Sequence, residues 1–254
     1  MTATTLTYQQ RIEKVYNALD KLTRELESQR DSRATFSLVY TRMTYKILLS
    51  LNEHTYLSPE TVTALTEAFA HKYMSAVEAY TEGTHCPPAW QYAFDTLKRT
   101  HTSLLDELLI CMYVHISYDL PYALWQVDQQ YPDILSIHDF HLVNDVLQSS
   151  IEEIQELVAQ RYSYRLFSLD RLLKNNDEII TNYGIRLSRG IAWYNFQRLK
   201  ANIDIESALY RSCEVNTRLI INGPYRITQL PLKIIRYLLN LDRLWPSDDE
   251  KELV

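Results

Sequence analysis

Glycine is scarce in this chain, with 4 glycines among 254 residues. Dinucleotide-binding and P-loop proteins need glycine in their phosphate loops, and all-β proteins need it in their tight turns. The chain has no Gly-rich phosphate loop and no sustained alternation of apolar and polar residues. The scarcity therefore argues against a nucleotide-binding α/β protein and against an all-β protein.

Cysteine and basic clusters are also rare. The 3 cysteines form no Cys-x-x-Cys pattern and leave one unpaired, which indicates a reduced, cytoplasmic protein. The net charge is -6 and no Lys/Arg cluster is present, so we expect no nucleic-acid partner. The longest apolar run is far too short for a membrane span, and residues 1–7 lack the features of a signal peptide. We expect a soluble protein without a membrane partner, and a homo-oligomer stays open.

Apolar residues follow a helical period in most segments of the chain. Apolar residues recur at spacings of three and four, as in the stripe Ile12, Val15, Leu19, Leu22 and Leu26. The expected helices cover residues 8–30, 35–51, 59–83, 90–119, 121–131, 137–158, 177–201, 204–221 and 231–244. We predict an all-α fold, a single helical domain over residues 1–254 with about eight to ten helices, a proline-kinked central helix and an acidic tail from about residue 246.

The stretch His115–Pro121 (His-Ile-Ser-Tyr-Asp-Leu-Pro) places ionisable residues inside an apolar run. His115 and Asp119 are four residues apart, so on a helix their side chains share one face. Pro121 has no backbone N–H to donate, and it disfavours helical geometry at the residue before it. We therefore expect the central helix to end or kink within residues 118–122, next to the ionisable pair.

Three interpretations fit the spacing of His115 and Asp119. Both side chains can ligate one divalent metal, such as zinc, manganese or iron. Alternatively, Asp119 orients the imidazole and raises its basicity, which gives a metal-free general base. The structural alternative is a buried histidine satisfied by a nearby carboxylate, or an aspartate that caps the next helix.

A second polar group begins the expected helix 137–158, with His138, Asp139, His141, Asn144 and Asp145. Metal sites in helical bundles draw ligands from facing helices, so Asp139 is the candidate third ligand beside His115 and Asp119. The alternative role of Asp139 is to stabilise the positive end of its own helix.

Further side chains are candidates for substrate binding. Arg186, Arg189 and Trp193 lie at spacings of three and four, so this row can hold an anionic substrate or be solvated charge beside a core tryptophan. Three tyrosines surround the central motif and could line a pocket: Tyr113, Tyr118 and Tyr122.

Four segments resemble a bacterial family, domain-of-unknown-function family 5995. Residues 112–120, Met-Tyr-Val-His-Ile-Ser-Tyr-Asp-Leu, resemble its Met-Asn-Ala-His-Ile-Asn-x-Asp-Leu string. Residues 88–94, 139–144 and 189–193 are similar to three further segments of the family and occur in the same order. The resemblance spans residues 36 to 200. It implies an all-helical fold and a polar signature of His115, Asp119, Asp139 and Asn144. Tyr113 and Ser117 stand where the family string has asparagine, and the resemblance implies no activity.

Three functions fit these residues. The first is a metal-dependent, hydrolase-like enzyme acting on a small organic substrate, with one divalent metal at His115, Asp119 and Asp139 and with Asn144 in the site. A looser similarity to helical zinc phospholipases and nucleases rests on the His-x-x-x-Asp pair alone. The second is a metal-free lyase or cyclase that uses His115 and Asp119 as acid and base in a tyrosine-lined pocket. The third is an interaction protein with a buried polar network.

Overall fold

The computed structural model describes residues 6–99, 102–163, 184–223 and 243–246. Within these ranges every regular element is a helix and no strand occurs, which confirms the predicted all-α fold. The elements are α1 (Tyr8–Ser28), α2 (Ala34–Glu53), α3 (Pro59–Glu82), α4 (Pro88–Arg99), α5 (Leu104–Val114), η1 (His115–Asp119), α6 (Leu120–Gln130), α7 (Ile137–Ser149), α8 (Ile151–Tyr162), α10 (Gly184–Lys200) and α11 (Glu206–Asn222). Among the described helices none is long and apolar enough to cross a bilayer.

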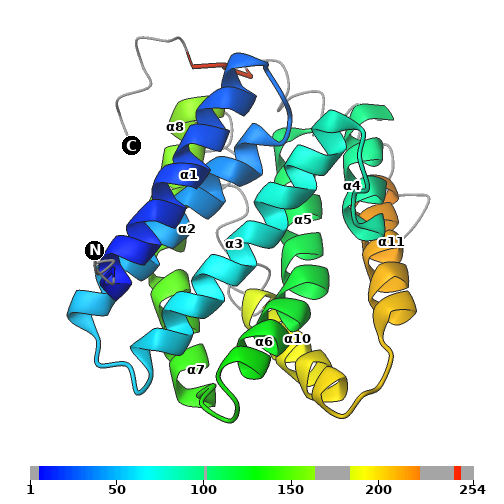
Figure 1. The fold of residues 1–254 in the computed structure, drawn as a ribbon. Helices are drawn as coiled ribbons and strands as arrows, with labels where there is room; N and C mark the ends of the chain where they lie inside the picture. The colour runs from blue at the N-terminus through cyan, green and yellow to red at the C-terminus, as the bar shows by residue number, and fades with distance from the viewer. Residues whose placement is uncertain (1–5, 100–101, 164–183, 224–242, 247–254) are drawn as a thin grey trace.

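Helix α3 crosses the middle of the molecule (Figure 1). The α1–α2 pair lies on one side of it, with α8 behind, and α4 and α11 lie on the other side. Helix α5 contacts α2, α4 and α11, so it joins the two sides. Helices α6, α7 and α10 gather at the lower end in this view, where α6 packs against both α3 and α10.

Two helices that the sequence predicts as continuous are interrupted. The expected helix 90–119 is divided between α4 and α5, so this prediction was wrong. The cause is a capping box: Ser103 Oγ accepts from the Asp106 N–H (3.3 Å), and the Asp106 carboxylate accepts from the Ser103 N–H (2.8 Å). The expected helix 137–158 is divided at Ser150. The apolar period continues across both breaks and so conceals them. The expected helix 231–244 lies almost wholly outside the described residues.

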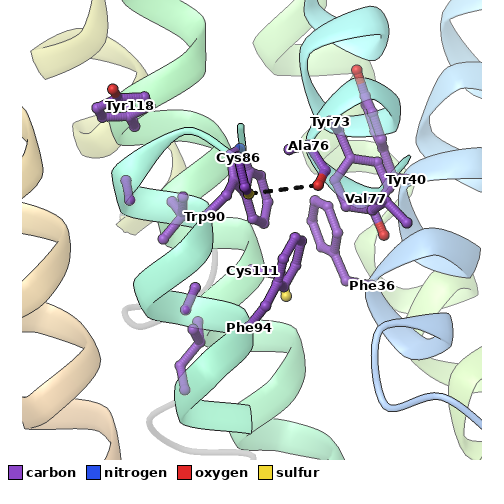
Figure 2. Packing of buried hydrophobic residues seen from close by; sticks show 14 of the residues in the cluster. Phe36, Tyr40, Tyr73, Ala76, Val77, Cys86, Trp90, Phe94, Cys111 and Tyr118 are labelled. Atoms are coloured by element: carbon purple, nitrogen blue, oxygen red, sulfur yellow. Dashed lines mark hydrogen bonds between the residues drawn. The ribbon is translucent and has the colours of Figure 1, made fainter. Parts of the chain in front are cut away.

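The centre of the core is a group of aromatic rings from α2, α3 and α4 (Figure 2). Phe36 meets Tyr73 edge to face with ring centroids 4.9 Å apart, and Trp90 stacks on Phe94 at 5.0 Å. Such pairs add about 0.5–1.5 kcal/mol each beyond the area they bury. The rings surround the central helix on the side where His115 lies.

All three cysteines are free and buried in this core. Cys86 Sγ lies 3.6 Å from the Ala76 carbonyl oxygen (Figure 2). Burial raises the pKa of the Cys213 thiol to about 12 and that of Cys86 to about 11. The thiols therefore stay protonated at neutral pH and serve as small apolar side chains rather than nucleophiles.

The central helix changes its hydrogen-bond pattern at the polar motif. Helix α5 leads into the π-helical turn η1, and α6 follows with Pro121 in its first turn. The Leu120 N–H donates to the His115 carbonyl oxygen, which is the i to i+5 pattern of a π-helix. The π-helical turn spans residues 115–119, so it begins three residues before the window 118–122 in which an end or kink was predicted. Leu120 keeps helical angles (φ -61°, ψ -41°), and α6 continues through Pro121.

Candidate functional site

The η1 turn places His115 and Asp119 in direct contact. His115 Nδ1 lies 2.9 Å from Asp119 Oδ2, and the two residues are 2% and 3% exposed. Because an ionised carboxylate only accepts hydrogen bonds, Nδ1 carries the hydrogen and donates it. The lone pair is then on Nε2, which is buried and has no hydrogen-bond partner within the described part of the chain.

The imidazole of His115 is neutral at pH 7. Burial lowers its pKa below the ordinary value, and the positive charge of Arg189 lowers it too, whereas the hydrogen bond and charge of Asp119 oppose the shift. The Trp90 indole N–H donates a second hydrogen bond to Asp119 Oδ2 (2.8 Å). Asp119 is therefore fixed from α4, and it in turn fixes the tautomer of His115.

Aromatic rings hold the imidazole in place. The His115 ring is stacked on Phe69, with ring centroids 3.6 Å apart and an interplanar angle of 5°. Tyr40 meets the imidazole edge to face at 4.5 Å. Because the ring is held between α2 and α3 in this way, the direction of Nε2 is set by packing as well as by Asp119.

A cavity of about 110 Å³ adjoins His115 and opens partly to solvent. Most of its wall is apolar and comes from α2, α3, α7 and α10, with Val39, Leu65 and Val143 as examples. The titratable side chains on the wall are Tyr40, His115, Asp139 and Arg189. A largely apolar cavity with a few convergent polar groups is the usual form of a small-molecule site.

Arg189 reaches this cavity from α10 and is 4% exposed. Its Nε donates to the side-chain oxygen of Asn144, and its guanidinium carbon lies 4.4 Å from the centroid of the Phe140 ring. Burial lowers the pKa of Arg189 to about 10, so the guanidinium remains charged at pH 7. Among the described residues no carboxylate forms an ion pair with it.

Tyr40 is a second polar group at the wall without a partner. Its hydroxyl is buried and makes no hydrogen bond to any described residue. Burial raises the pKa of Tyr40 well above its ordinary value, so the phenol keeps its proton and can donate it. The Arg189 charge acts on the pKa of Tyr40 as well as on that of His115, which indicates that all three groups lie close together.

Asp139 lines the cavity, but its carboxylate is already occupied. One oxygen accepts from the Leu57 N–H (2.9 Å) and the other from the Ser58 N–H (2.8 Å). These bonds attach α7 to the segment just before α3. In the part of the chain that the structure describes, no group of three His, Cys, Asp or Glu side chains could hold a metal ion. The predicted set of His115, Asp119 and Asp139 gains no support from this geometry.

The predicted substrate-binding residues divide into two groups. Arg189 and Trp193 lie on the cavity wall, and Asn144 lies behind Arg189 as its hydrogen-bond partner. The tyrosines of the central motif are not among the wall residues. The Tyr113 hydroxyl is bonded to Ser212 and Asn216 of α11, and Tyr118 packs against Tyr122 with ring centroids 5.6 Å apart.

Three contributors to the site were not predicted as such. Tyr40 and Phe69 follow the apolar period of their helices, so nothing in the sequence separates them from ordinary core residues. Trp90 lies in a segment that carries the family resemblance, which is the one signal that could have marked its bond to Asp119.

Comparison with protein families agrees with this description. The model of a family described as "Family of unknown function (DUF5995)" matches residues 12–221, which include the cavity wall, His115, Asp119 and Arg189. No curated protein and no solved structure matches the chain. Because the match covers most of its length, the chain belongs to this family of unknown function.

Proposed function

We propose that this protein is a metal-free acid–base enzyme of the lyase or cyclase type, with His115 as the group that transfers the proton. The observation that carries the proposal is the unpartnered Nε2 of a neutral, buried imidazole, in a residue that lines an apolar cavity. A buried nitrogen without a partner costs stability, about 1–3 kcal/mol for an ordinary polar group. A role for that lone pair in binding and reacting with a substrate accounts for the cost.

The surroundings of His115 suit a general base. When Nε2 takes a proton from a substrate C–H or O–H group, the imidazole becomes an imidazolium, whose charge is stabilised by the Asp119 carboxylate 2.9 Å from Nδ1. The proton can then return from Nε2 to a second atom of the substrate. The Tyr40 phenol, protonated and unpartnered, can donate a hydrogen bond to negative charge that develops on the substrate.

The apolar wall favours elimination or ring closure over hydrolysis. Few polar groups are present to hold an attacking water, and a water-poor site strengthens the attraction between His115 and Asp119 during proton transfer. The lyase or cyclase alternative therefore receives more support from the geometry than the metal-dependent hydrolase does.

Solvent exchange tests the proposal without knowledge of the natural substrate. Small ketones and 2-oxo acids are incubated with the protein in D₂O, and deuterium entry beside the carbonyl group is followed by NMR. We expect catalysed exchange with the wild type, a loss of about 100-fold or more in His115→Gln and a smaller loss in Asp119→Asn.

The exposed His141 provides a matched control, because His141→Gln removes an imidazole that does not line the cavity. This variant should catalyse deuterium exchange into the substrate at the wild-type rate. Equal exchange by His115→Gln and the wild type, with both proteins folded, would contradict a catalytic role and leave the dyad as a structural network.

A further inference from the structure

We infer that the cavity binds a small monocarboxylate, whose carboxylate group pairs with Arg189 while its apolar part fills the space beside His115. The inference names the substrate class of the proposed enzyme, and it rests on the proposed function for what His115 does after binding. Arg189 differs from Arg33 and Arg161 in having no carboxylate partner among the described residues.

Arg33, which is buried, and Arg161, which is half-buried, have carboxylate partners. Arg33 pairs with Asp31 through two hydrogen bonds of 2.9 and 2.6 Å, and Arg161 pairs with Glu27 through bonds of 2.7 and 2.8 Å. Arg189 is as deeply buried as either, yet its hydrogen-bond partner is the neutral amide of Asn144, and only through Nε. Both terminal nitrogens of its guanidinium lack a hydrogen-bond partner among the described residues.

The terminal nitrogens of the Arg189 guanidinium are suited to bind a carboxylate. A guanidinium presents its N–H groups as a planar fork that matches the two oxygens of a carboxylate. Asn144 and the Phe140 ring hold the guanidinium in position, which reduces the entropy lost when a ligand binds. A buried charge that is pre-positioned but unpaired is the arrangement expected of a site that receives its counterion from a ligand.

The charges of the cavity favour a monoanion. Arg189 supplies one positive charge, His115 is neutral, and Asp139 on the same wall is an acid. A phosphate dianion would bring a second negative charge that no described group on the wall balances. A single carboxylate neutralises Arg189 and leaves the Tyr40 hydroxyl for the negative charge that develops on the substrate.

The volume and wall define the rest of the ligand. The cavity measures about 110 Å³, somewhat less than the roughly 150 Å³ of an apolar cavity known to take up benzene. Aliphatic and aromatic side chains such as Leu65, Val143 and Trp193 form the wall. A short alkyl chain or small ring fits such a space, and it would lie against His115.

The test compares hexanoate with its neutral isostere hexanamide by isothermal titration calorimetry. We expect the wild type to bind hexanoate at least about tenfold more tightly, as a charge-assisted hydrogen-bond pair requires. Arg189→Gln should remove this preference while hexanamide binding persists, which also shows that the variant is folded. Arg186→Gln is the matched control: Arg186 lies on the same helix, is exposed and pairs with Asp145, so the preference should be unchanged.

Two further variants keep the test decisive. Arg189→Lys retains the charge without the planar fork and should show an intermediate preference, even if Arg189→Gln fails to fold. His141→Gln should still prefer hexanoate, because His141 is exposed and does not line the cavity. Absence of hexanoate binding, equal binding of hexanoate and hexanamide by the wild type, or an unchanged preference in Arg189→Gln would overturn the inference.

The two proposals fail in different ways. Hexanoate binding through Arg189 without any His115-dependent deuterium exchange would contradict the enzyme and leave the carboxylate site intact. His115-dependent exchange of neutral ketones, with no preference for hexanoate, would contradict the carboxylate site and leave the enzyme intact.

Discussion

Two regions of the molecule differ in how their charged groups are partnered: the ion pair between α1 and α8, and the cavity beside the central helix. At the first, Glu27 accepts two hydrogen bonds from Arg161 and one from the Tyr162 hydroxyl (2.6 Å), so both charges are fully matched. At the cavity, Arg189 has an amide partner and an aromatic ring, and His115 Nε2 has no partner within the described chain. Glu27 is as deeply buried as His115 and Arg189, so burial alone does not explain the difference.

We infer that the residues of the matched pair stabilise the fold, whereas the unmatched residues at the cavity bind a ligand. A matched buried pair links two helices, and its loss leaves an uncompensated charge. An unmatched buried group lowers stability in the free protein, and such groups concentrate at functional sites. The same side-chain type, arginine, can thus have opposite effects on stability within one molecule.

The largest expected effect is at the matched pair. Glu27→Ala leaves the half-buried Arg161 without its counterion, so we expect the free energy of unfolding to fall by about 3 kcal/mol. Urea unfolding followed by circular dichroism measures the loss. The exposed Glu13 serves as the control, and Glu13→Ala should change stability by less than about 0.5 kcal/mol. A loss below about 1 kcal/mol in Glu27→Ala would remove the contrast between the two regions.

The second effect concerns pH. Burial lowers the pKa of His115 in the folded state, while an unfolded histidine titrates near 6.5. As pH falls below about 6.5 the unfolded chain binds a proton that the folded state does not, so this residue makes the protein less stable in acid. Other titratable groups face the ring: Asp119 on the same turn, Tyr40 on α2, Tyr73 on α3 and Arg189 on α10.

The measurement is the slope of stability against pH between pH 7 and pH 5, in the wild type and in His115→Gln. The variant should lose less stability over this range than the wild type does. Parallel slopes would mean that His115 has the same proton affinity in the folded and unfolded states, and the account of a neutral buried base would fail.

The third effect is expected to be small, in contrast to the first. Arg189→Met keeps an unbranched apolar stem and removes an unmatched buried charge, so we expect the free energy of unfolding to change by no more than about 1 kcal/mol in either direction. Urea unfolding under the conditions used for Glu27→Ala gives a direct comparison. A loss as large as that of Glu27→Ala would show that Arg189 stabilises the fold as Arg161 does.

The smallest effect comes from filling the cavity. Val143 lies on its wall, so Val143→Leu adds a methylene group to empty space and should raise stability by about 0.5–1 kcal/mol. The added group competes with the ligand, so hexanoate affinity should fall at the same time. Lower stability with unchanged hexanoate binding would indicate that the wall closes around Val143 in solution and that the ligand lies elsewhere.

The fold could be predicted from the sequence because periodicity is a local signal. The stripe on residues 8–30 corresponds to α1, and the helix expected over residues 59–83 corresponds to α3. The breaks at Ser103 and Ser150 carry a weak sequence signal, a serine followed three residues later by an acid, which the continuous apolar period outweighed. The π-helical form of η1 is set by packing around the central helix.

The site was predictable only in part. The spacing of His115 and Asp119 was sufficient to expect contact, because both residues lie on one short helical segment. The pairing of Asn144 with Arg189 joins residues that lie 45 positions apart, and only the fold brings them together. The roles of Tyr40 and Phe69 depend on their distance from His115 in space, which apolar periodicity does not encode.

The central claim is that Nε2 of His115 is a free base beside a site where Arg189 binds the carboxylate of a ligand. Long-range ¹H–¹⁵N NMR of the imidazole at pH 7, assigned by comparison with His115→Gln, tests it most directly. The account predicts a neutral ring with its hydrogen on Nδ1, and an Nε2 resonance that shifts when hexanoate is added. A charged ring, a hydrogen on Nε2, or an Nε2 resonance that does not respond to hexanoate at saturating concentration would contradict it.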